Sequence, residues 1–343
     1  MTLGSTSTST STSNTPRILL LGGHGKVALL LTPHLLARSW NVTSVIRDEA
    51  QREDILNAAA KAQAIARSGG PDTAAAAGAG TDDTAGAGGN GSGSGSGSGV
   101  GKLDILISSL DEVKSEGDAR KVIEQVGAHW VVWCAGAGGK GGPERTYAID
   151  RDAARHYISA SVPPAAAETG RSTSSSSSSG SGSGGGGVRK FLMISALSNR
   201  RGRAAWWTDE DWALVQRMNT EFLPHYYAAK MDADEYLTGM AEAARRGRGR
   251  SNFQAIVLRP GGLSDEPATG FVSLGKTKAK GMVTRGDVAH VAARLLERDD
   301  THGWYDLLSG QEDVAAAVSR VATEQVDAIE GEDVQRIYDQ VYA

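Results

Sequence analysis

The chain has 343 residues, a formal net charge of −4 and one cysteine, Cys134. A weakly negative chain is disfavoured as a nucleic-acid or membrane-surface binder, because those partners attract strongly basic proteins. One cysteine excludes an internal disulfide and is typical of a reducing compartment. No apolar run reaches the roughly 18 residues that a membrane span requires. We therefore expect a cytoplasmic protein that binds neither nucleic acid nor membrane, with Cys134 as a buried structural thiol.

Three low-complexity tracts interrupt the chain. Residues 1–16 are rich in Ser and Thr, and residues 61–101 and 164–187 are rich in Gly, Ser and Ala. Such compositions bury no core and are typical of tails and linkers. The rest, about 260 residues, is a size that one α/β domain commonly has. This predicts a disordered tail at 1–16 and a single domain at 17–343 with disordered insertions at about 61–101 and 164–187.

Strand-like and helix-like patterns alternate along the rest of the chain. Apolar or alternating runs predict seven strands, at residues 17–21, 41–46, 103–108, 130–135, 189–194, 253–258 and 304–308. Helices are expected at 27–38, from about 49, at 122–126, at 151–161 with Asp150 as N-cap, after Thr208, and at 226–246, 284–296 and 314–329. This alternation predicts a doubly wound, Rossmann-like parallel sheet of about seven strands with helices on both faces.

The first predicted strand runs into a glycine-rich turn. The turn consists of Gly22, Gly23, His24, Gly25, Lys26 and Val27, and the helix at 27–38 follows it. Glycines let the backbone turn sharply and approach a ligand, and the opening amides of a helix attract a diphosphate. An ordinary turn is the alternative, but the strand–turn–helix context favours a dinucleotide site.

Other strand ends supply candidates for the same site, since ligands bind beyond the carboxyl ends of such strands. Arg47 follows the second strand, where a cation suits the extra phosphate of NADP(H), and Lys26 is a candidate second cation. Asp48 comes one residue later, so NAD(H) stays an alternative to the favoured NADP(H). From position alone, we expect Ser108, Ser109 and Leu110 to flank the adenine. The far side of the diphosphate should be lined by Cys134, Ala135, Gly136 and Ala137.

The helix predicted at 226–246 carries a candidate acid/base pair. Tyr226 and Lys230 are one helical turn apart, so both project from the same face. A nearby ammonium lowers the pKa of a phenol, which makes it a better proton donor and acceptor at neutral pH. Ser195 or Ser198, after the fifth strand, is a candidate to bind the same substrate oxygen. Spacing alone does not exclude Tyr227, and a solvated helix face is the structural alternative.

These motifs make the chain similar to the short-chain dehydrogenase/reductase superfamily, in particular its atypical, NAD(P)-binding branch. The resemblance rests on residues 22–28, the Tyr226–Lys230 pair, and segments 258–263 and 284–289, and it extends from Arg17 to about Gly310. It implies a nicotinamide cofactor, Tyr226 as acid/base and Lys230 holding the nicotinamide ribose. It also implies that Pro260, Gly261, Gly262 and Leu263 line the nicotinamide end.

Two segments are open to a second interpretation. Trp206, Trp207 and Trp212 lie in a stretch before the acid/base helix that is longer and richer in tryptophan than the family pattern. They are candidates for the lining of a substrate pocket. The alternative is the hydrophobic core, where aromatic clusters are found more often. Thr284 to Asp287 is most simply a helix cap, although the resemblance places it near the substrate lobe. His225 is expected at the surface.

The sequence thus predicts an enzyme, an NAD(P)-binding oxidoreductase that uses NADPH to reduce a small carbonyl-like substrate with Tyr226 as acid/base. One alternative is a sugar-nucleotide epimerase-like enzyme that retains NAD, and another is a non-catalytic NAD(P)-sensing regulator. A small molecule is the expected partner and no metal is expected. The substrate, the reaction direction and the oligomeric state do not follow from the sequence.

Overall fold

The computed structural model describes residues 15–67, 99–138, 141–162, 187–247 and 253–342. Most of the predicted tail and of the two predicted insertions lies outside these ranges. Residues 62–67 are an exception, because α3 (Ala62–Arg67) is a helix that lies against α1 (Lys26–Ala37), with Ala62 buried. The predicted start of the first insertion therefore moves from residue 61 to beyond Arg67, since this alanine-rich stretch favours helix and fits the core.

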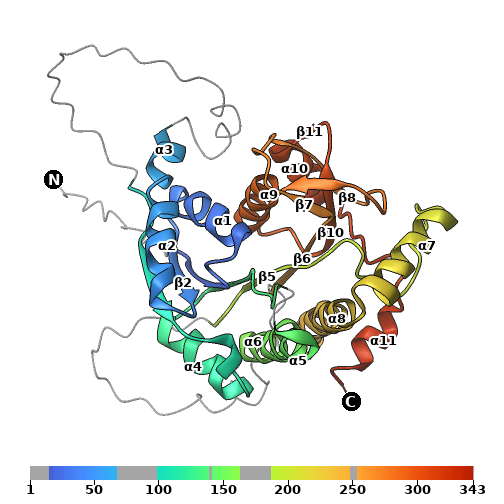
Figure 1. Ribbon diagram of the computed structural model, residues 1–343, viewed down its shortest axis with the longest axis horizontal. Coiled ribbons are helices and arrows are strands. Elements are labelled where there is room, and N and C mark those ends of the chain that lie inside the picture. The colour runs from blue at the N-terminus through green and yellow to red at the C-terminus, as the bar shows by residue number, and fades with distance from the viewer. Residues whose placement is uncertain (1–14, 68–98, 139–140, 163–186, 248–252, 343) are drawn as a thin grey trace, which may run out of the picture.

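One large sheet organises the described residues (Figure 1). Its nine strands have the order β11-β8-β10-β6-β5-β4-β1-β2-β3. The bounds are β1 Arg17–Leu21, β2 Asn41–Ile46, β3 Leu103–Ile107, β4 Trp130–Trp133, β5 Lys190–Ile194, β6 Gln254–Pro260, β8 Phe271–Gly275, β10 Gly303–Ser309 and β11 Glu312–Asp313. All neighbours from β10 to β3 are parallel, whereas β8 is antiparallel to β10 and β11. The doubly wound, mostly parallel α/β fold is confirmed, with nine strands rather than about seven.

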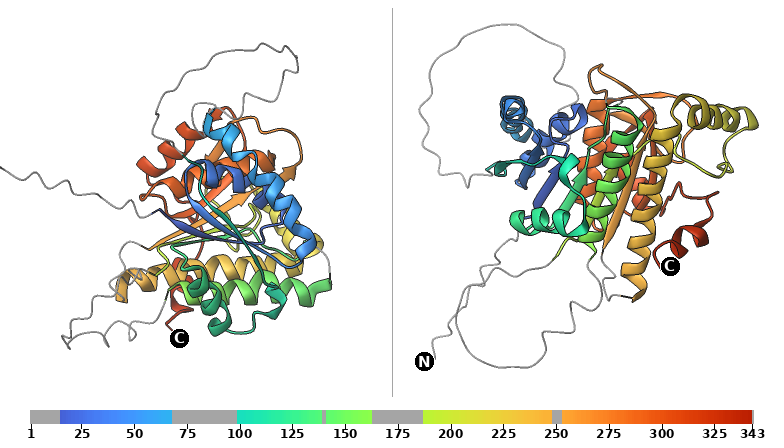
Figure 2. Two further views of the ribbon diagram at one scale, coloured as in Figure 1. Left: turned by 90° about the vertical axis from the view of Figure 1, so that its left-hand side faces the viewer. Right: turned by 60° about the horizontal axis from the view of Figure 1, so that its bottom comes forward.

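Helices cover both faces of this sheet (Figure 2). The further α-helices are α2 Arg52–Ala59, α4 Glu116–Val126, α5 Gly142–Thr146, α6 Ala154–Ser161, α7 Asp209–Arg217, α8 Pro224–Gly247, α9 Arg285–Glu297, α10 Val314–Thr323 and α11 Val334–Asp339. Helices α1, α9 and α10 pack on one face and α4, α6 and α8 on the other. In β1, Ile18 and Leu20 belong to the core under α1, α9 and α10, and Leu19 and Leu21 belong to the core under α4, α6 and α8. This two-sided burial explains why β1 is a continuous apolar run.

Several local predictions need correction. Asp150 does not cap a helix start, because residues 142–161 are continuously helical through a π-helical segment, η4 (Tyr147–Ala153), and Asp150 is buried inside it. The helix predicted at 314–329 ends at Thr323. Four strands of the described residues were not predicted. β11 and the small parallel pair β7 (Gly262–Ser264) and β9 (Met282–Thr284) have two or three residues each, too few to give a sequence signal. β8 has five residues, as many as β1, and was missed although its length is ordinary. Among the described helices, none is long and apolar enough to cross a membrane.

Candidate cofactor and active site

The glycine-rich loop follows β1, which lies between β4 and β2 at the point where strand order reverses. Open α/β sheets bind nucleotides at such switch points. Gly22 has a φ of +77°, and a Cβ there would lie 2.6 Å from the Ala135 Cα. A Cβ on Gly23 would lie 1.9 Å from the Ser44 Oγ. Only glycine therefore fits these two positions, and the backbone of the loop lies directly against β4 and β2.

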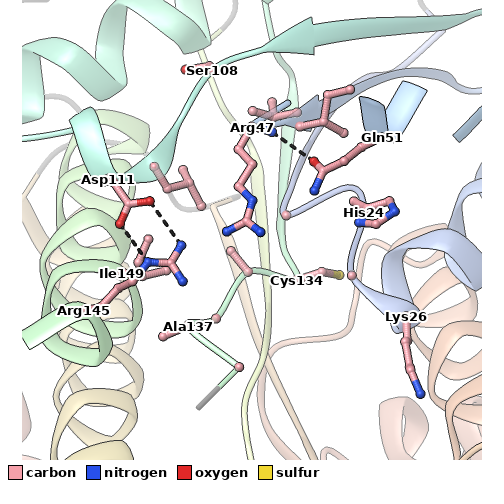
Figure 3. Close-up of a pocket in the computed structure, with 18 residues that line it drawn as sticks. His24, Lys26, Arg47, Gln51, Ser108, Asp111, Cys134, Ala137, Arg145 and Ile149 are labelled. Atoms are coloured by element: carbon pink, nitrogen blue, oxygen red, sulfur yellow. Dashed lines mark hydrogen bonds and ion pairs between the residues drawn. The ribbon is translucent and has the colours of Figure 1, made fainter. Parts of the chain in front are cut away.

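A cavity of about 450 Å³ opens beside this loop (Figure 3). Its lining includes the predicted cofactor residues Gly22, His24, Gly25, Lys26, Arg47, Ser108, Ala135 and Gly136. Its wall also contains Leu110, Cys134 and Ala137, which position along the chain had placed at the cofactor as well. It further contains residues that the sequence did not assign to the cofactor, namely Gln51, Asp111, Gly138, Arg145 and Ile149. The predicted residues Gly23, Val27, Ser109, Pro260, Gly261 and Gly262 do not line it. Ser109 instead caps η3 (Leu110–Glu112), and Pro260 ends β6, the neighbour of β5.

The features of this cavity fit a dinucleotide. Helix α1 begins at the loop with Gly25 as N-cap, without a side-chain cap or an acidic residue in its first turn. The start of α1, at Gly25 and Lys26, lies in the wall of the cavity, where its opening amides and the positive end of its dipole suit a diphosphate. Two carboxylates from other segments pair with side chains of the loop, Asp54 with His24 and Asp265 with Lys26, each at 2.7 Å. Within the described residues, no group of three or more His, Cys, Asp or Glu side chains is arranged to hold a metal.

Arg47 is exposed, and its guanidinium points into the cavity towards Asp111 and Arg145 (Figure 3). Arg145 pairs with Asp111 through two contacts of 3.1 Å. Arg145, together with a smaller effect of Arg47, holds the pKa of Asp111 below its usual value. The position of Asp111 just after β3 could have drawn attention to it. Arg145 belongs to α5, more than thirty residues later, and carries no comparable sequence signal.

Lys26 does not face Arg47. Its Nζ lies 2.7 Å from the Asp265 Oδ2, and Asp265 also pairs with Arg285 at 2.7 Å. Figure 3 shows the Lys26 side chain directed away from the Arg47 guanidinium. The prediction of Lys26 as a second cation beside Arg47 is therefore not supported. Sequence spacing placed Lys26 in the correct loop but gave no information about its partner from a distant loop.

Lys230 lies beneath the ends of β4 and β5. Its side chain is almost fully buried, and its Nζ donates to the carbonyl oxygens of Ala135 at 3.3 Å and Ile194 at 3.2 Å. The Asp150 Oδ1 lies 3.3 Å from the same Nζ. Burial lowers the pKa of Lys230, but the charges of Asp150, Tyr226 and Asp234 outweigh it and the net pKa is raised. Lys230 is therefore an ammonium, and it touches the backbone of a residue that lines the cavity.

The two tyrosines of α8 have different surroundings. Tyr227 donates its hydroxyl hydrogen to the Arg200 carbonyl oxygen at 3.1 Å. Tyr226 is partly buried one turn before Lys230, and no hydrogen bond of its hydroxyl to another described residue is found. Burial raises the pKa of Tyr226, and the opposing effect of Lys230 does not cancel this. The expected pKa-lowering effect of Lys230 is present, but the net direction is upward.

The candidate serines are less favourably placed for contact with a substrate. Ser195 is buried, and its hydroxyl donates to the Asp234 carboxylate and accepts a hydrogen bond from Asn199 at 3.0 Å. Asp234 is one turn beyond Lys230, and burial raises its pKa to about 6. Ser198 is partly buried, and its carbonyl oxygen accepts from Asn219 at 2.7 Å. Ser195 thus connects the end of β5 to α8.

Other predicted features are structural. Trp207 is buried in a small core with Leu197 and Leu308, and the indole N–H groups of Trp206 and Trp207 both donate to the Thr277 carbonyl oxygen at 2.8 Å. The core interpretation therefore applies to Trp207, whereas Trp206 and Trp212 pack at the edge of the same cluster.

The caps predicted at Thr208 and Thr284 are confirmed. Cys134 is partly buried and lines the cavity, so the predicted buried position is wrong. Desolvation still raises the pKa of its thiol to about 12, which agrees with an unreactive thiol. His225 is exposed, as expected, and lies 3.2 Å from the Tyr147 hydroxyl.

The fold and the glycine loop at its switch point define a dinucleotide-binding protein, and comparison with known proteins agrees. The model of the NAD(P)H-binding family matches residues 181–299. The uncharacterized sugar epimerase YhfK of Bacillus subtilis is 30% identical over 196 residues, which are 57% of this chain and 70% of that protein. A UPF0659 protein of Schizosaccharomyces pombe is 26% identical over 305 residues, which are 88% of this chain and 93% of that protein.

Two solved structures share the fold. A Bacillus halodurans protein named as an NAD-dependent epimerase/dehydratase has 22% identity and a TM-score of 0.56, covering 89% of this chain and 99% of that one. The oxidoreductase YlbE of Lactococcus lactis has 17% identity and a TM-score of 0.53, covering 90% and 97%. The chain belongs to the NAD(P)H-binding family of Rossmann-fold oxidoreductase- and epimerase-like enzymes, of the atypical short-chain dehydrogenase/reductase type.

Proposed function

We propose that this enzyme uses NADPH to reduce a small carbonyl-like substrate, with Tyr226 as the proton donor. The observation that carries this proposal is the contact between Lys230 and the Ala135 carbonyl oxygen, because Ala135 also lines the cavity beside the glycine loop. The acid/base helix and the cofactor cavity therefore share one wall. When bound, the nicotinamide supplies the hydride.

The surroundings of Tyr226 suit a proton donor. Its phenol has a pKa that burial raises, so it is protonated at neutral pH and can release the proton to a substrate oxygen that gains negative charge. The Lys230 ammonium stabilises the phenolate that remains. Ser195 would donate to a substrate oxygen only after its hydrogen leaves Asp234, so Ser198 is the better candidate for that contact.

The surroundings of Arg47 support NADPH over NADH. The Arg47 guanidinium is exposed at the end of β2 and can bind a phosphate through two parallel hydrogen bonds. The rival residue, Asp48, accepts a hydrogen bond from the Ala50 amide at 2.9 Å and so begins the next helical turn. The Asp48 carboxylate therefore already accepts a backbone hydrogen bond, which weakens the case for Asp48 as a ribose ligand.

An epimerase-like activity is the second candidate, and the name of the YhfK relative favours it. The nucleotide that co-purifies with the protein distinguishes the candidates, together with NADPH absorbance measured over a panel of aldehydes and ketones. The reductase proposal predicts exchangeable NADP(H) and loss of NADPH with at least one carbonyl. Tightly retained NAD(H), with no net consumption during turnover of a nucleotide sugar, supports the epimerase. Cofactor binding without any turnover supports a regulator.

A further inference from the structure

Asp150, which the sequence placed at a helix start, lies between the acid/base helix and the wall of the cavity. Only 1% of the residue is exposed, and its carboxylate makes two contacts across the site. Oδ1 lies 3.3 Å from the Lys230 Nζ, and Oδ2 accepts a hydrogen bond from the Ala137 amide at 2.9 Å. Ala137 lines the cavity, and a Cβ on its neighbour Gly136 would lie 3.0 Å from Oδ1. One buried carboxylate thus touches the acid/base helix and the cavity wall.

We propose that Asp150 is a positioning residue that keeps Lys230 charged and holds residues 135–137 in place, so that cofactor binding depends on the Asp150 charge. The inference rests on the proposed function, in which Lys230 holds the nicotinamide ribose. Asp150 lies in η4, and π-helical turns inside longer helices occur often at functional sites. A mere helix cap would require neither the burial nor the ion pair.

The other groups that face Lys230 do not replace Asp150. Tyr226 and Asp234 come from the same helix, and the Cys134 thiol comes from the end of β4. The phenol and the thiol are both neutral at neutral pH, because burial raises the pKa of each. Asp234 accepts the hydroxyl hydrogen of Ser195 instead. Among the described residues, Asp150 is the carboxylate within ion-pair distance of Lys230.

The test measures the Kd of NADPH from the fluorescence of the reduced nicotinamide. It covers about pH 6 to pH 10, and the upper limit is close to the ordinary pKa values of tyrosine and lysine. Asp150→Asn keeps the shape and an acceptor for the Ala137 amide but removes the charge, whereas Asp150→Ala removes both. Asp152→Asn is the matched control, because this carboxylate lies two residues later in η4 and pairs with Arg151 at 2.6 Å instead. Lys230→Met reports the proposed ribose contact, and thermal melts of all variants establish that each is folded.

We expect Asp150→Asn to weaken NADPH binding by about tenfold, as the loss of a charged hydrogen-bond partner does. The loss should begin at a lower pH than in the wild type, because the buried ammonium without its carboxylate releases its proton earlier. Asp150→Ala should weaken binding at every pH, and Asp152→Asn should match the wild type. In a Lys230→Met background, Asp150→Asn should cause little further loss of affinity.

Two results overturn the inference in different ways. If Lys230→Met weakens binding while Asp150→Asn has the affinity and pH profile of the wild type, only the role of Asp150 is wrong. If Lys230→Met itself binds NADPH as tightly as the wild type, the proposed ribose contact fails and the inference fails with it. If Asp150→Asn is unfolded, the Lys230→Met, Asp150→Asn double variant replaces it, because the double variant leaves no unpaired buried charge. The proposed coupling is contradicted if the double variant binds NADPH much more weakly than Lys230→Met alone.

Discussion

The two ends of the proposed cofactor site, an adenosine end at Arg47 and an acid/base end at Lys230, hold their charges in opposite ways. At the adenosine end, Arg47 is exposed and the Asp111–Arg145 pair is partly exposed, on turns and short helices. At the acid/base end, Lys230, Asp150 and Asp234 are each at most 3% exposed. Exposed charges cost little to rearrange around a ligand, whereas buried charges are fixed by their partners before any ligand arrives. The first end is suited to selecting a nucleotide and the second to moving a proton.

Lys230→Met, at the acid/base end, should have the largest effect on stability, turnover and NADPH affinity. Breaking a buried pair leaves Asp150 uncompensated and costs about 3–5 kcal/mol of unfolding free energy. Turnover and NADPH affinity should both fall, since the side chain is assigned to the phenol and to the ribose. Thermal melts, rates and NADPH titrations measure the three effects. A variant as stable as the wild type would show that the acid/base end is not held by buried charge.

Arg47→Asp should weaken NADPH binding by about tenfold or more and leave NADH binding nearly unchanged, because the lost partner is a phosphate that only NADPH carries. The melting temperature should hardly change, since Arg47 is exposed. Titration of both nucleotides against both proteins measures this. Equal affinities in the wild type would refute the assignment of Arg47 as the selecting residue.

Asp234→Asn should stabilise the protein above about pH 6, and this advantage should shrink as the pH falls from about 6, the raised pKa of Asp234, towards its ordinary value of 3.8. A carboxyl whose pKa is higher in the folded state costs stability progressively between its unfolded and its folded pKa, and the cost is complete above the folded pKa. The expected gain at neutral pH is a few degrees in melting temperature. Melts of the wild type and the variant between about pH 3.5 and pH 8, which span the window set by the linkage, measure it. A difference independent of pH would mean that Asp234 does not titrate as a buried acid.

Lys26→Ala should have the smallest effect, a change of less than about twofold in NADPH affinity, because exposed ion pairs contribute little and this ammonium is paired with Asp265. The same nucleotide titration applies. A loss comparable to that of Arg47→Asp would restore Lys26 as the second phosphate cation and assign more of the selection to the glycine loop.

The cavity wall at the proposed adenosine end could largely be predicted from the sequence, because its residues follow strands directly. The glycine loop and Arg47 stand next to β1 and β2, so a strand prediction also places them. The partners of the acid/base end come from distant segments. Asp150 and Lys230 are 80 residues apart, and Ser195 meets Asp234 across 39 residues. The local sequence pattern placed Asp150 at a helix start. A π-helical segment has no periodicity that the sequence reveals, so the pattern could not show that this carboxylate points into the protein.

Tyr226 is the proposed proton donor, and Tyr226→Phe, with Tyr227→Phe as the control, tests this role. The matched measurement is the single-turnover rate of NADPH oxidation with a carbonyl substrate, together with the Kd of NADPH. Tyr226→Phe should bind NADPH nearly as tightly as the wild type and react about 10²–10⁴-fold more slowly, the contribution of general acid catalysis. Tyr227→Phe should keep its rate, because it loses only the hydrogen bond to the Arg200 carbonyl. A Tyr226→Phe enzyme with the wild-type rate, or a Tyr227→Phe enzyme without activity, would contradict the account.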